Sequence, residues 1–279
     1  MNKLKRNLII LIILFILVIF GIVYVVSDNF KDTLPSGIAD IIENITPKSS
    51  TNYDLEELEK MWKDNYAIND DYVGQIIFDS GLINLPFVQG NSNDTYLRTD
   101  WQTMQYNIEG SVFMDSECEV DDQNMTIYGH YVYSQYDPSA THMFTPLKKL
   151  MDQENYDENK HVLIVFQDGI REYDVATVYY CQLTSNDRGE YLYTRDDLQY
   201  YWRNIGGDIE FNYDNRNISE DYFNAYKATI QIEEFYKTNV RYTKSDKFVT
   251  LQTCVENRDD LREIVILKEV SRHAFESSN

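Results

Sequence analysis

A cysteine and an arginine lie eight residues apart near the end of the chain. Cys254 closes the apolar, β-prone stretch 247–254, and Arg262 opens the next such stretch. A cation beside a thiol favours the thiolate, which is the nucleophilic form, and a guanidinium can also stabilise the oxyanion that forms when a carbonyl is attacked. A hairpin between the two stretches would bring Arg262 back alongside Cys254. The pair therefore indicates acyl transfer with Cys254 as the nucleophile.

Acyl transfer also needs a proton donor, and the chain contains four histidines. His130 follows the apolar run 125–129, whose last residue is a glycine that lets the backbone turn, and a residue in such a position commonly faces a cleft. Of the other three, His142 lies in a polar loop, His161 precedes a predicted strand, and His273 is near the C-terminus. We predict His130 as the acid and base, against the alternative that a histidine at a strand end is structural. Because His130 and His142 match no metal-ligand spacing, we expect no metal.

The odd number of cysteines, three, leaves at least one thiol unpaired. Outside the cell cysteines normally pair, so a free thiol there indicates a functional role. Cys118 and Cys181 could form a disulfide and leave Cys254 alone, or they could be ordinary small residues in or beside strands. Both possibilities stay open, because the sequence does not give the separation of the two Cα atoms.

Residues 8–26 are almost uninterrupted Leu, Ile, Val and Phe and carry no charge. As a helix, at about 1.5 Å per residue, this segment nearly crosses a bilayer core of ~30 Å. Basic residues precede it and aspartates follow it, which favours a cytoplasmic N-terminus and an exported remainder. A cleaved signal peptide is the alternative, but its apolar part would be shorter and no small-x-small cleavage pattern follows. We expect a cytoplasmic tail (1–7), a transmembrane anchor (8–26) and an extracellular stalk (27–52).

The chain carries 46 acidic and 25 basic residues, which gives a formal net charge of −21. Nucleic acid and anionic lipid surfaces both require a basic face, so this charge argues against them as partners. Aromatic residues make up 14% of the chain, which is too rich in core-forming side chains for a disordered protein. The part that follows the stalk fits one large domain, 53–273.

Hydrophobic patterns predict that this domain is mainly β. Residues 53–66 carry apolar side chains at helical spacing after Asp54, a candidate N-cap. Eight short β-branched or aromatic runs predict strands: 73–78, 82–88, 111–114, 125–130, 162–167, 172–183, 247–254 and 263–270. Helical patterns interrupt them at 143–151, with Pro146 in the first turn, and at 219–237, before the cysteine strand. Many short strands at this rhythm favour an antiparallel barrel or a sandwich.

Three short motifs stand in a characteristic order. Residues 128–130 are Tyr-Gly-His, residues 250–254 are Thr-Leu-Gln-Thr-Cys, and Arg262 opens the following strand. Together with 85–90 and 110–115, these motifs resemble the sortase family of membrane-anchored cysteine transpeptidases. The similarity spans roughly residues 55 to 270, and order over such a length is far harder to match by chance than any one motif. The helix predicted before the cysteine strand is a class B feature, so the resemblance is to class B.

The resemblance implies a closed antiparallel sortase-type barrel of about eight strands, with an N-terminal helix and a helix before the cysteine strand. It also implies a single-pass membrane protein with an extracellular catalytic domain and no cofactor. Such an enzyme cleaves the C-terminal sorting signal of a surface protein, of LPxTG type or a class B variant, through a thioacyl intermediate. The acyl group then passes to an amine of a peptidoglycan precursor or, in a pilin-polymerising sortase, to a pilin lysine.

The family's roles carry over to individual residues. Cys254 is implied as the nucleophile, His130 as the acid and base, and Arg262 as the cation that stabilises the oxyanion. Substrate-binding positions are implied at three further residues: Thr253, Leu251 and Tyr131. For Leu251 the alternative is simple packing in the core.

The chain departs from the family's pattern in two regions. Tyr131 stands where the family often has Asn, and the loop 131–142 is longer than expected, so we expect a reshaped rim of the active site. Residues 184–216 exceed the usual connection and predict an insertion. Two other classes of protein stay open: a surface-anchored binding module whose cysteine is incidental, and a papain-like hydrolase in which an Asp or Asn orients His130.

Overall fold

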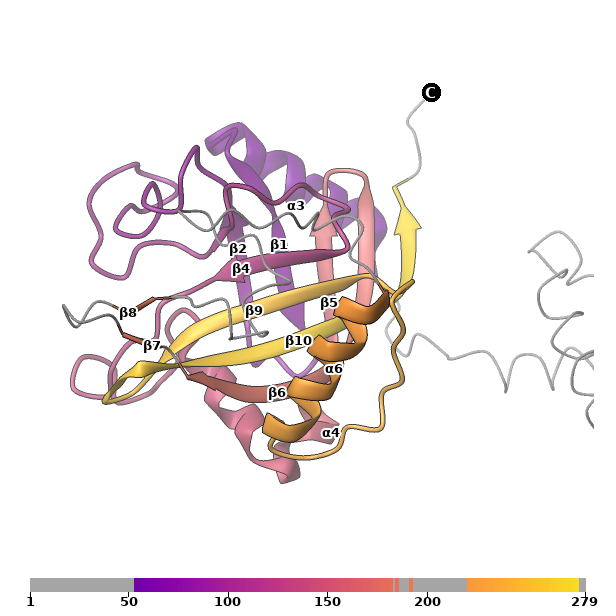
Figure 1. Cartoon of the computed structure of the whole chain (residues 1–279). Helices are drawn as coiled ribbons and strands as arrows, with labels where there is room; N and C mark the ends of the chain where they lie inside the picture. The colour runs from indigo at the N-terminus through magenta and orange to yellow at the C-terminus, as the bar shows by residue number, and fades with distance from the viewer. Residues whose placement is uncertain (1–52, 183, 186–190, 193–219, 276–279) are drawn as a thin grey trace, which may run out of the picture. The chain divides into compact units, whose positions relative to one another are not determined.

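Eight strands close into a barrel, drawn in Figure 1. The structure is a computed structural model, and it describes residues 53–182, 184–185, 191–192 and 220–275. Around the barrel the strands follow the order β1-β2-β3-β4-β9-β10-β6-β5. Their bounds are β1 Tyr72–Phe78, β2 Asn84–Val88, β3 Phe113–Met114, β4 Asn124–Tyr128, β5 His161–Phe166, β6 Gly169–Gln182, β9 Phe248–Val255 and β10 Arg258–Ala274.

These strands confirm the prediction of a mainly β fold with a closed barrel. Each of the eight predicted runs forms one strand of the barrel, because β-branched and aromatic side chains pack well on the pleated, largely buried wall. The barrel is not antiparallel throughout, however. The pairs β2–β3 and β4–β9 are parallel. Parallel neighbours need a long crossover connection, which the chain between β4 and β9 supplies.

Short helices surround the barrel. Their bounds are α3 Leu55–Ile68, η2 Thr145–Met151, η3 Gln153–Asn155, α4 Tyr156–Asn159 and α6 Glu220–Glu233. Asp54 caps α3 as predicted, because its side chain accepts a hydrogen bond from the Glu57 amide at 3.1 Å. The predicted segment 143–151 forms the 3-10 helix η2 with Pro146 near its start. The predicted helix 219–237 is α6, which ends earlier, so Phe235 lies beyond it and is 39% exposed.

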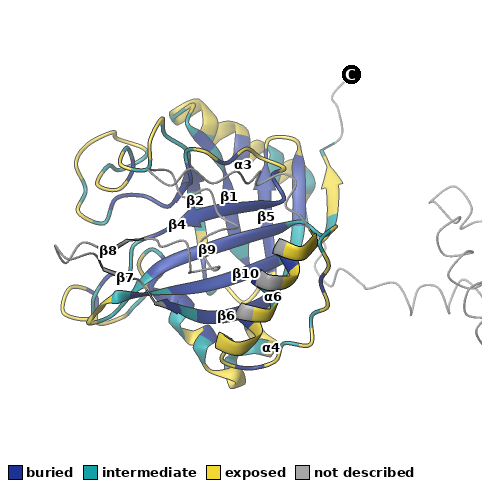
Figure 2. Cartoon of the chain, viewed as in Figure 1, coloured by how far each residue is buried: buried dark blue, intermediate teal, exposed yellow. Residues whose placement is uncertain are grey.

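Two apolar clusters lie on opposite faces of the barrel wall. The inner cluster fills the barrel and includes Leu251 of β9 and Val265 of β10, both fully buried. The outer cluster lies under α6 and includes Phe248 of β9 and Ile264 of β10. Figure 1 shows α6 lying across the outside of β6 and β10, and Figure 2 shows these strands as buried. Because successive side chains of a strand point to opposite faces, β9 and β10 contribute to both clusters.

Several sequence predictions concern residues outside the described ranges. The tail, the anchor and the stalk all fall within 1–52, and most of the predicted insertion 184–216 is also outside. Of that insertion the structure describes only the strand pair β7 (Thr184–Ser185) and β8 (Tyr191–Leu192). Among the residues described, no helix has the length and apolar character needed to span a membrane. The transmembrane anchor therefore stays a prediction.

Candidate active site

Cys254 and Arg262 are direct partners across β9 and β10. The turn between the strands brings Arg258 opposite Val255, and a regular antiparallel ladder from that pair would put Asp259 opposite Cys254. Instead the register shifts over residues 259–261, and Arg262 takes that place. An irregularity of this kind commonly serves to redirect a side chain. Here it puts a basic residue, Arg262, opposite Cys254 in place of the acidic Asp259.

The Arg262 side chain is held by the backbone of the same hairpin. Its Nη1 donates hydrogen bonds to the carbonyl oxygens of Leu261 at 2.7 Å and Asp259 at 3.1 Å. Arg262 and Cys254 are both partly exposed. Directly opposed side chains in an antiparallel pair lie on the same face with Cβ atoms about 5 Å apart. The Arg262 and Cys254 side chains therefore leave neighbouring positions on the outer face of the barrel, and the guanidinium is held by the hairpin backbone.

The other two cysteines are enclosed. None of the three cysteines forms a disulfide, so the suggested Cys118–Cys181 bridge is absent. Cys118 is 3% exposed in the inner cluster, and Cys181 is fully buried in the outer cluster under α6. Cys181 pairs in register with Arg262 from the β6 side, opposite to Cys254. Of the three thiols, Cys254 alone is accessible.

His130 reaches the same level of the barrel from β4. The parallel pairing of β4 with β9 ends at Tyr128 and Gln252, and the Gly129 amide still donates to the Gln252 carbonyl at 3.2 Å. Continued by two residues, this register brings His130 level with Cys254. The long-range pairing of β4 with β9 thus brings together the strand ends that carry the predicted nucleophile and the predicted acid.

The imidazole of His130 has two polar neighbours in the loop before β3. Nε2 lies 2.8 Å from the carbonyl oxygen of Leu97 and 3.2 Å from a guanidinium nitrogen of Arg98. Burial lowers the pKa of His130 and Arg98 lowers it further, while the Leu97 carbonyl and Glu109 raise it. The neutral ring is therefore favoured at neutral pH. When Nε2–H donates to Leu97, the Nδ1 lone pair can accept a proton.

The contacts of His130 bear on the papain-like alternative. In that class a carboxylate or an amide side chain orients the histidine. Among the described residues, the hydrogen-bonding neighbours of His130 are the Leu97 carbonyl and the Arg98 guanidinium instead. No hydrogen bond of the described residues joins the His130 ring directly to Cys254. Leu97 is part of the Tyr96-Leu97 pair that supports the family resemblance, but sequence reasoning gave neither Leu97 nor Arg98 a role, because their contacts with His130 depend on how the loop before β3 folds.

Tyr133 also lies close to the candidate nucleophile. Its hydroxyl donates to Asp259 at 3.4 Å. Burial raises the pKa of Tyr133, Cys254 and Asp259 raise it further, and Arg262 lowers it. The phenol is therefore within electrostatic reach of both Cys254 and Arg262. No sequence signal singled out Tyr133, because its place depends on how the loop 131–142 folds against the β9–β10 hairpin.

The three predicted substrate-binding residues are placed differently from one another. Leu251 is fully buried in the inner cluster, which favours the alternative of core packing. Thr253 is 3% exposed and pairs with Glu263, on the opposite face of β9 from Cys254. Tyr131 is half-buried beside the site, with its hydroxyl 3.3 Å from a Glu256 carboxylate oxygen. Of the three, only Tyr131 lies where a peptide near Cys254 could meet it.

A buried carboxyl lies on the inner face of the same strands. Glu263 is 1% exposed and pairs with Thr253 on one side and Tyr180 on the other. Burial raises its pKa to about 8, an effect that Lys148 partly offsets. Within the described part of the chain, neither Glu263 Oε1 nor Thr253 Oγ1 has a hydrogen-bond partner. Glu263 is therefore protonated at neutral pH, directly behind the wall that carries Cys254.

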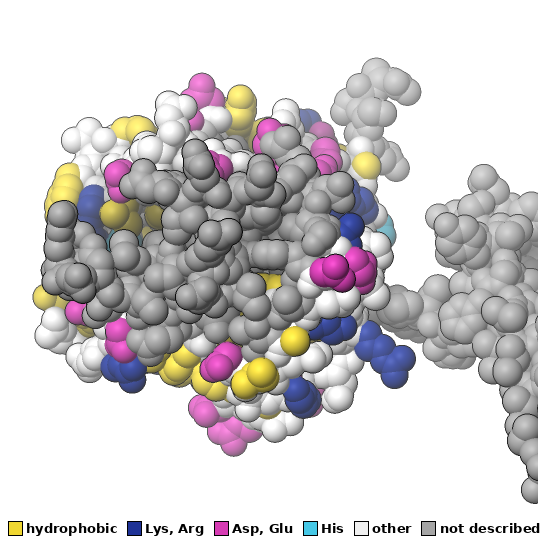
Figure 3. Space-filling view, viewed as in Figure 1, with side chains coloured by type: hydrophobic (Ala, Val, Ile, Leu, Met, Phe, Trp, Pro, Cys, Tyr) yellow, Lys and Arg dark blue, Asp and Glu magenta, His cyan; other side chains and the backbone are white. Residues whose placement is uncertain are grey.

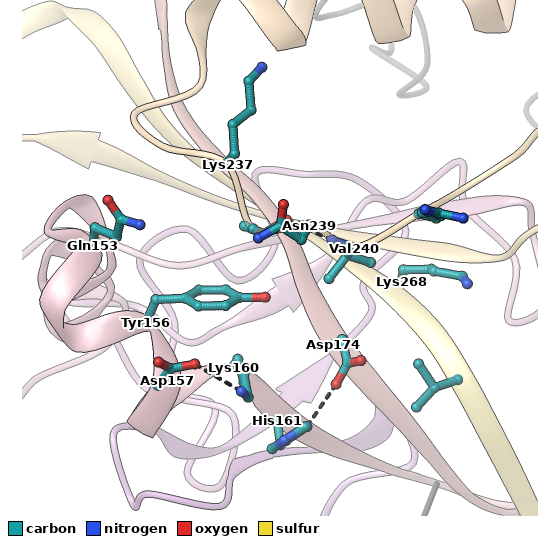
Figure 4. Close-up of a pocket in the computed structure, with 13 residues that line it drawn as sticks. Gln153, Tyr156, Asp157, Lys160, His161, Asp174, Lys237, Asn239, Val240 and Lys268 are labelled. Carbon is teal, nitrogen blue, oxygen red and sulfur yellow. Dashed lines mark hydrogen bonds and ion pairs between the residues drawn. The ribbon is translucent and has the colours of Figure 1, made fainter. Parts of the chain in front are cut away.

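A polar cavity of about 590 Å³ lies towards the far end of β10 (Figure 4). Lys268 of β10 lines this cavity. Among the other lining residues, Lys160 forms an ion pair with Asp157 at 2.9 Å, and His161 forms a hydrogen bond with Asp174 at 2.7 Å. Cys254, His130 and Arg262 do not line it.

Elsewhere, Figure 3 shows acidic side chains spread among basic ones on the face that it draws. No cluster of His, Cys, Asp and Glu in the described ranges could hold a metal ion.

Comparisons with known proteins agree with this geometry. The chain is 24% identical over 219 residues to sortase B of Staphylococcus aureus, covering 77% of this chain and 74% of that protein. It is 25% identical over 213 residues to sortase B of Listeria monocytogenes, covering 76% of this chain and 73% of that protein. No family model matches the chain.

Solved structures give the same picture of the fold. Sortase B of Clostridium perfringens superposes with a TM-score of 0.58 at 23% identity, covering 75% of this chain and 99% of that one. A Bacillus anthracis protein similar to sortase B gives a TM-score of 0.56 at 25% identity, covering 78% of this chain and 94% of that one. The barrel and these matches support a protein of the sortase transpeptidase family. Within that family the chain is most like class B.

Proposed function

We propose that this chain is an extracellular cysteine transpeptidase that attaches surface proteins to the cell wall. Its substrate would be a C-terminal sorting signal of LPxTG type or a class B variant, and its acceptor an amine of a peptidoglycan precursor. Two observations of strand register support the proposal. Arg262 is the cross-strand partner of Cys254, whose thiol is accessible, and the register of β4 with β9, continued by two residues, puts His130 level with Cys254.

The first half of the reaction forms a thioester. The Cys254 thiolate attacks the carbonyl carbon of the substrate Thr, and Arg262 stabilises the resulting oxyanion. The tetrahedral intermediate then collapses, the Thr–Gly C–N bond breaks, and the His130 imidazolium gives its proton to the departing amine. The second half reverses the roles. The acceptor amine attacks the thioester, neutral His130 takes up its proton, and the Cys254 thiolate leaves.

The protonation states make a modest rate the expected outcome. Reference pKa values of ~8.5 for Cys and ~6.5 for His already leave thiolate and imidazolium together in a small fraction of molecules at neutral pH. Burial and Arg98 lower the pKa of His130 and reduce the imidazolium fraction further. We therefore expect a slow enzyme whose rate follows the population of this minor state.

Related structures support the choice of substrates. One solved relative is a Staphylococcus aureus sortase B–substrate complex, and another is a sortase B complexed with triglycine, a peptide that carries an amine. Those proteins therefore bind a substrate and a glycine peptide. We extend this to the present chain, together with single-pass anchoring through residues 8–26 and an exported catalytic domain.

The test uses the chain from residue 53 onward, a peptide that contains a Thr-Gly bond, and a glycine peptide as acceptor. Cys254→Ala, His130→Ala and Arg262→Ala are assayed in parallel, with mass spectrometry for the thioacyl adduct and the transfer product. We expect an adduct on Cys254 and an amide product. Release of the free acid despite abundant amine would favour a hydrolase, and activity that survives Cys254→Ala would exclude this mechanism.

A further inference from the structure

Two segments that leave the candidate active site are joined by side-chain hydrogen bonds. The 131–134 segment directly follows His130, and the 255–261 hairpin directly follows Cys254. Three contacts connect them. The amide of Ser134 donates to Glu256 at 2.8 Å, the hydroxyl of Tyr131 donates to Glu256 at 3.3 Å, and the hydroxyl of Tyr133 donates to Asp259 at 3.4 Å.

Glu256 makes two of these three contacts, one with each carboxylate oxygen. The bonds from Ser134 lower the pKa of Glu256 most, and Tyr131 and Lys148 lower it further, so the carboxylate is ionised at neutral pH. Hydrogen bonds to an ionised acceptor are shorter and stronger than those between neutral groups. Glu256 lies in the turn outside both apolar clusters, so its contacts concern the two segments and not the barrel core.

The loop after His130 is also held by contacts away from the hairpin. Tyr131 forms an isolated β-bridge with Met143, and the Val132 amide donates to the Thr145 hydroxyl at 2.8 Å. Asp137 accepts hydrogen bonds from several backbone amides of the loop, the shortest from Thr141 at 2.7 Å. The loop is therefore shaped by its own contacts, and Glu256 adds hydrogen bonds that join it to the hairpin after Cys254.

We propose that Glu256 is a positioning residue, whose carboxylate ties the segment after His130 to the hairpin after Cys254 and so sets the geometry between imidazole and thiol. This inference rests on the proposed function. Tyr133 lies on the tied segment and within electrostatic reach of Cys254 and Arg262, so the same contacts hold its phenol at the site. Misplacement of a reacting group by about 1 Å can cost ~100-fold in rate.

Two substitutions separate positioning from folding. Glu256→Ala removes both contacts, and we expect kcat to fall about 10- to 100-fold with KM changed less than about twofold. Glu256→Gln keeps an oxygen that can accept from the Ser134 amide, and we expect it to retain most of the rate. Glu233→Ala, at an exposed position of α6, is the matched control. Wild-type kcat in Glu256→Ala, or a fall in kcat explained by a lower melting temperature, would overturn the proposal.

A measurement without sorting substrate keeps this test independent of the proposed function. The rate of Cys254 alkylation by iodoacetamide is followed against pH, because its low-pH inflection reports the coupling between thiol and imidazole. We expect the inflection to move in Glu256→Ala and to stay in Glu256→Gln and the control. Identical profiles in wild type and Glu256→Ala would overturn the positioning role. Absence of any thioacyl adduct in the wild type would instead reject the proposed function and leave the alkylation result valid.

Discussion

The two faces of the β9–β10 pair differ sharply although their residues are neighbours in sequence. On the outer face Cys254, Arg262 and Cys181 form one cross-strand row. One position along, Thr253 and Glu263 form the corresponding row on the inner face with Tyr180. The outer row reaches solvent at Cys254, whereas Thr253 and Glu263 are almost wholly buried. A shift of one residue thus separates the accessible Cys254 and its partner Arg262 from a carboxyl that burial keeps protonated.

The outer row itself is divided by α6. Cys181 and Cys254 flank Arg262 on the same face, yet Cys181 is fully buried in the cluster under α6 and Cys254 lies beyond it. A neighbouring cation therefore does not make a cysteine reactive unless a substrate can also reach the sulfur. The comparison teaches that cover by a helix, more than the strand pattern, decides which of these two cysteines is accessible.

The largest expected effect separates the two cysteines. Cys254→Ala should lower transpeptidation by at least ~10⁴-fold, because it removes the group that forms the covalent intermediate. Cys181→Ala should leave kcat within about twofold and cost ~1–2 kcal/mol of stability through the small cavity under α6. Product formation by mass spectrometry and urea denaturation check the pair. Comparable losses of activity in both variants would contradict the prediction that Cys254, and not Cys181, forms the covalent intermediate.

The next largest effect concerns the cation of the outer row. Arg262→Ala should lower kcat about 10²- to 10³-fold, since the oxyanion loses its stabilising guanidinium. Arg262→Lys should fall between wild type and Arg262→Ala, because it keeps the charge without the planar fork of donors. The control is Arg258→Ala in the same hairpin, where Arg258 is exposed and pairs with Asp260 at 2.8 Å. A larger loss in the control than in Arg262→Ala would assign the effect to the hairpin.

On the inner face, Glu263 should make stability depend on pH. Its folded pKa is about 8, raised by burial from an ordinary value of 4.5. Between these values the folded protein holds one proton more than the unfolded chain, so stability should fall as pH rises from about 5 to 8. Glu263→Gln should remove this slope and gain on the order of 3 kcal/mol at pH 7. Urea denaturation at several pH values measures it, and parallel curves for both proteins would contradict it.

The smallest effect compares two threonines of β9. The buried hydroxyl of Thr253 has no hydrogen-bond partner among the described residues, whereas that of Thr250 donates to Asn124 at 2.9 Å. Thr253→Val should therefore raise stability by up to ~1 kcal/mol, and Thr250→Val should lower it by about 1 kcal/mol. Thermal denaturation of the two variants checks the opposite signs. Equal destabilisation by the two substitutions would mean that the Thr253 hydroxyl has a hydrogen-bond partner in solution.

Much of this organisation follows from local sequence. Short β-branched or aromatic runs predicted all eight strands of the barrel, Asp54 predicted the start of α3, and the spacing of Cys254 and Arg262 predicted their hairpin. These features depend on residues close together in the chain, so a pattern along the sequence is enough to indicate them. Leu251 was ambiguous because the same kind of run suits a groove and a core.

Only the tertiary structure decided the rest. The parallel pairing of β4 with β9 brings His130 level with Cys254, the register shift at 259–261 selects Arg262 over Asp259, and α6 covers Cys181. The loop contacts through Glu256 are likewise long-range. Alternation in a strand determines that side chains point to two faces, but which face is covered depends on elements far away in the chain. For this protein, sequence determined the strands and the reactive residue types, and packing determined which of them meet.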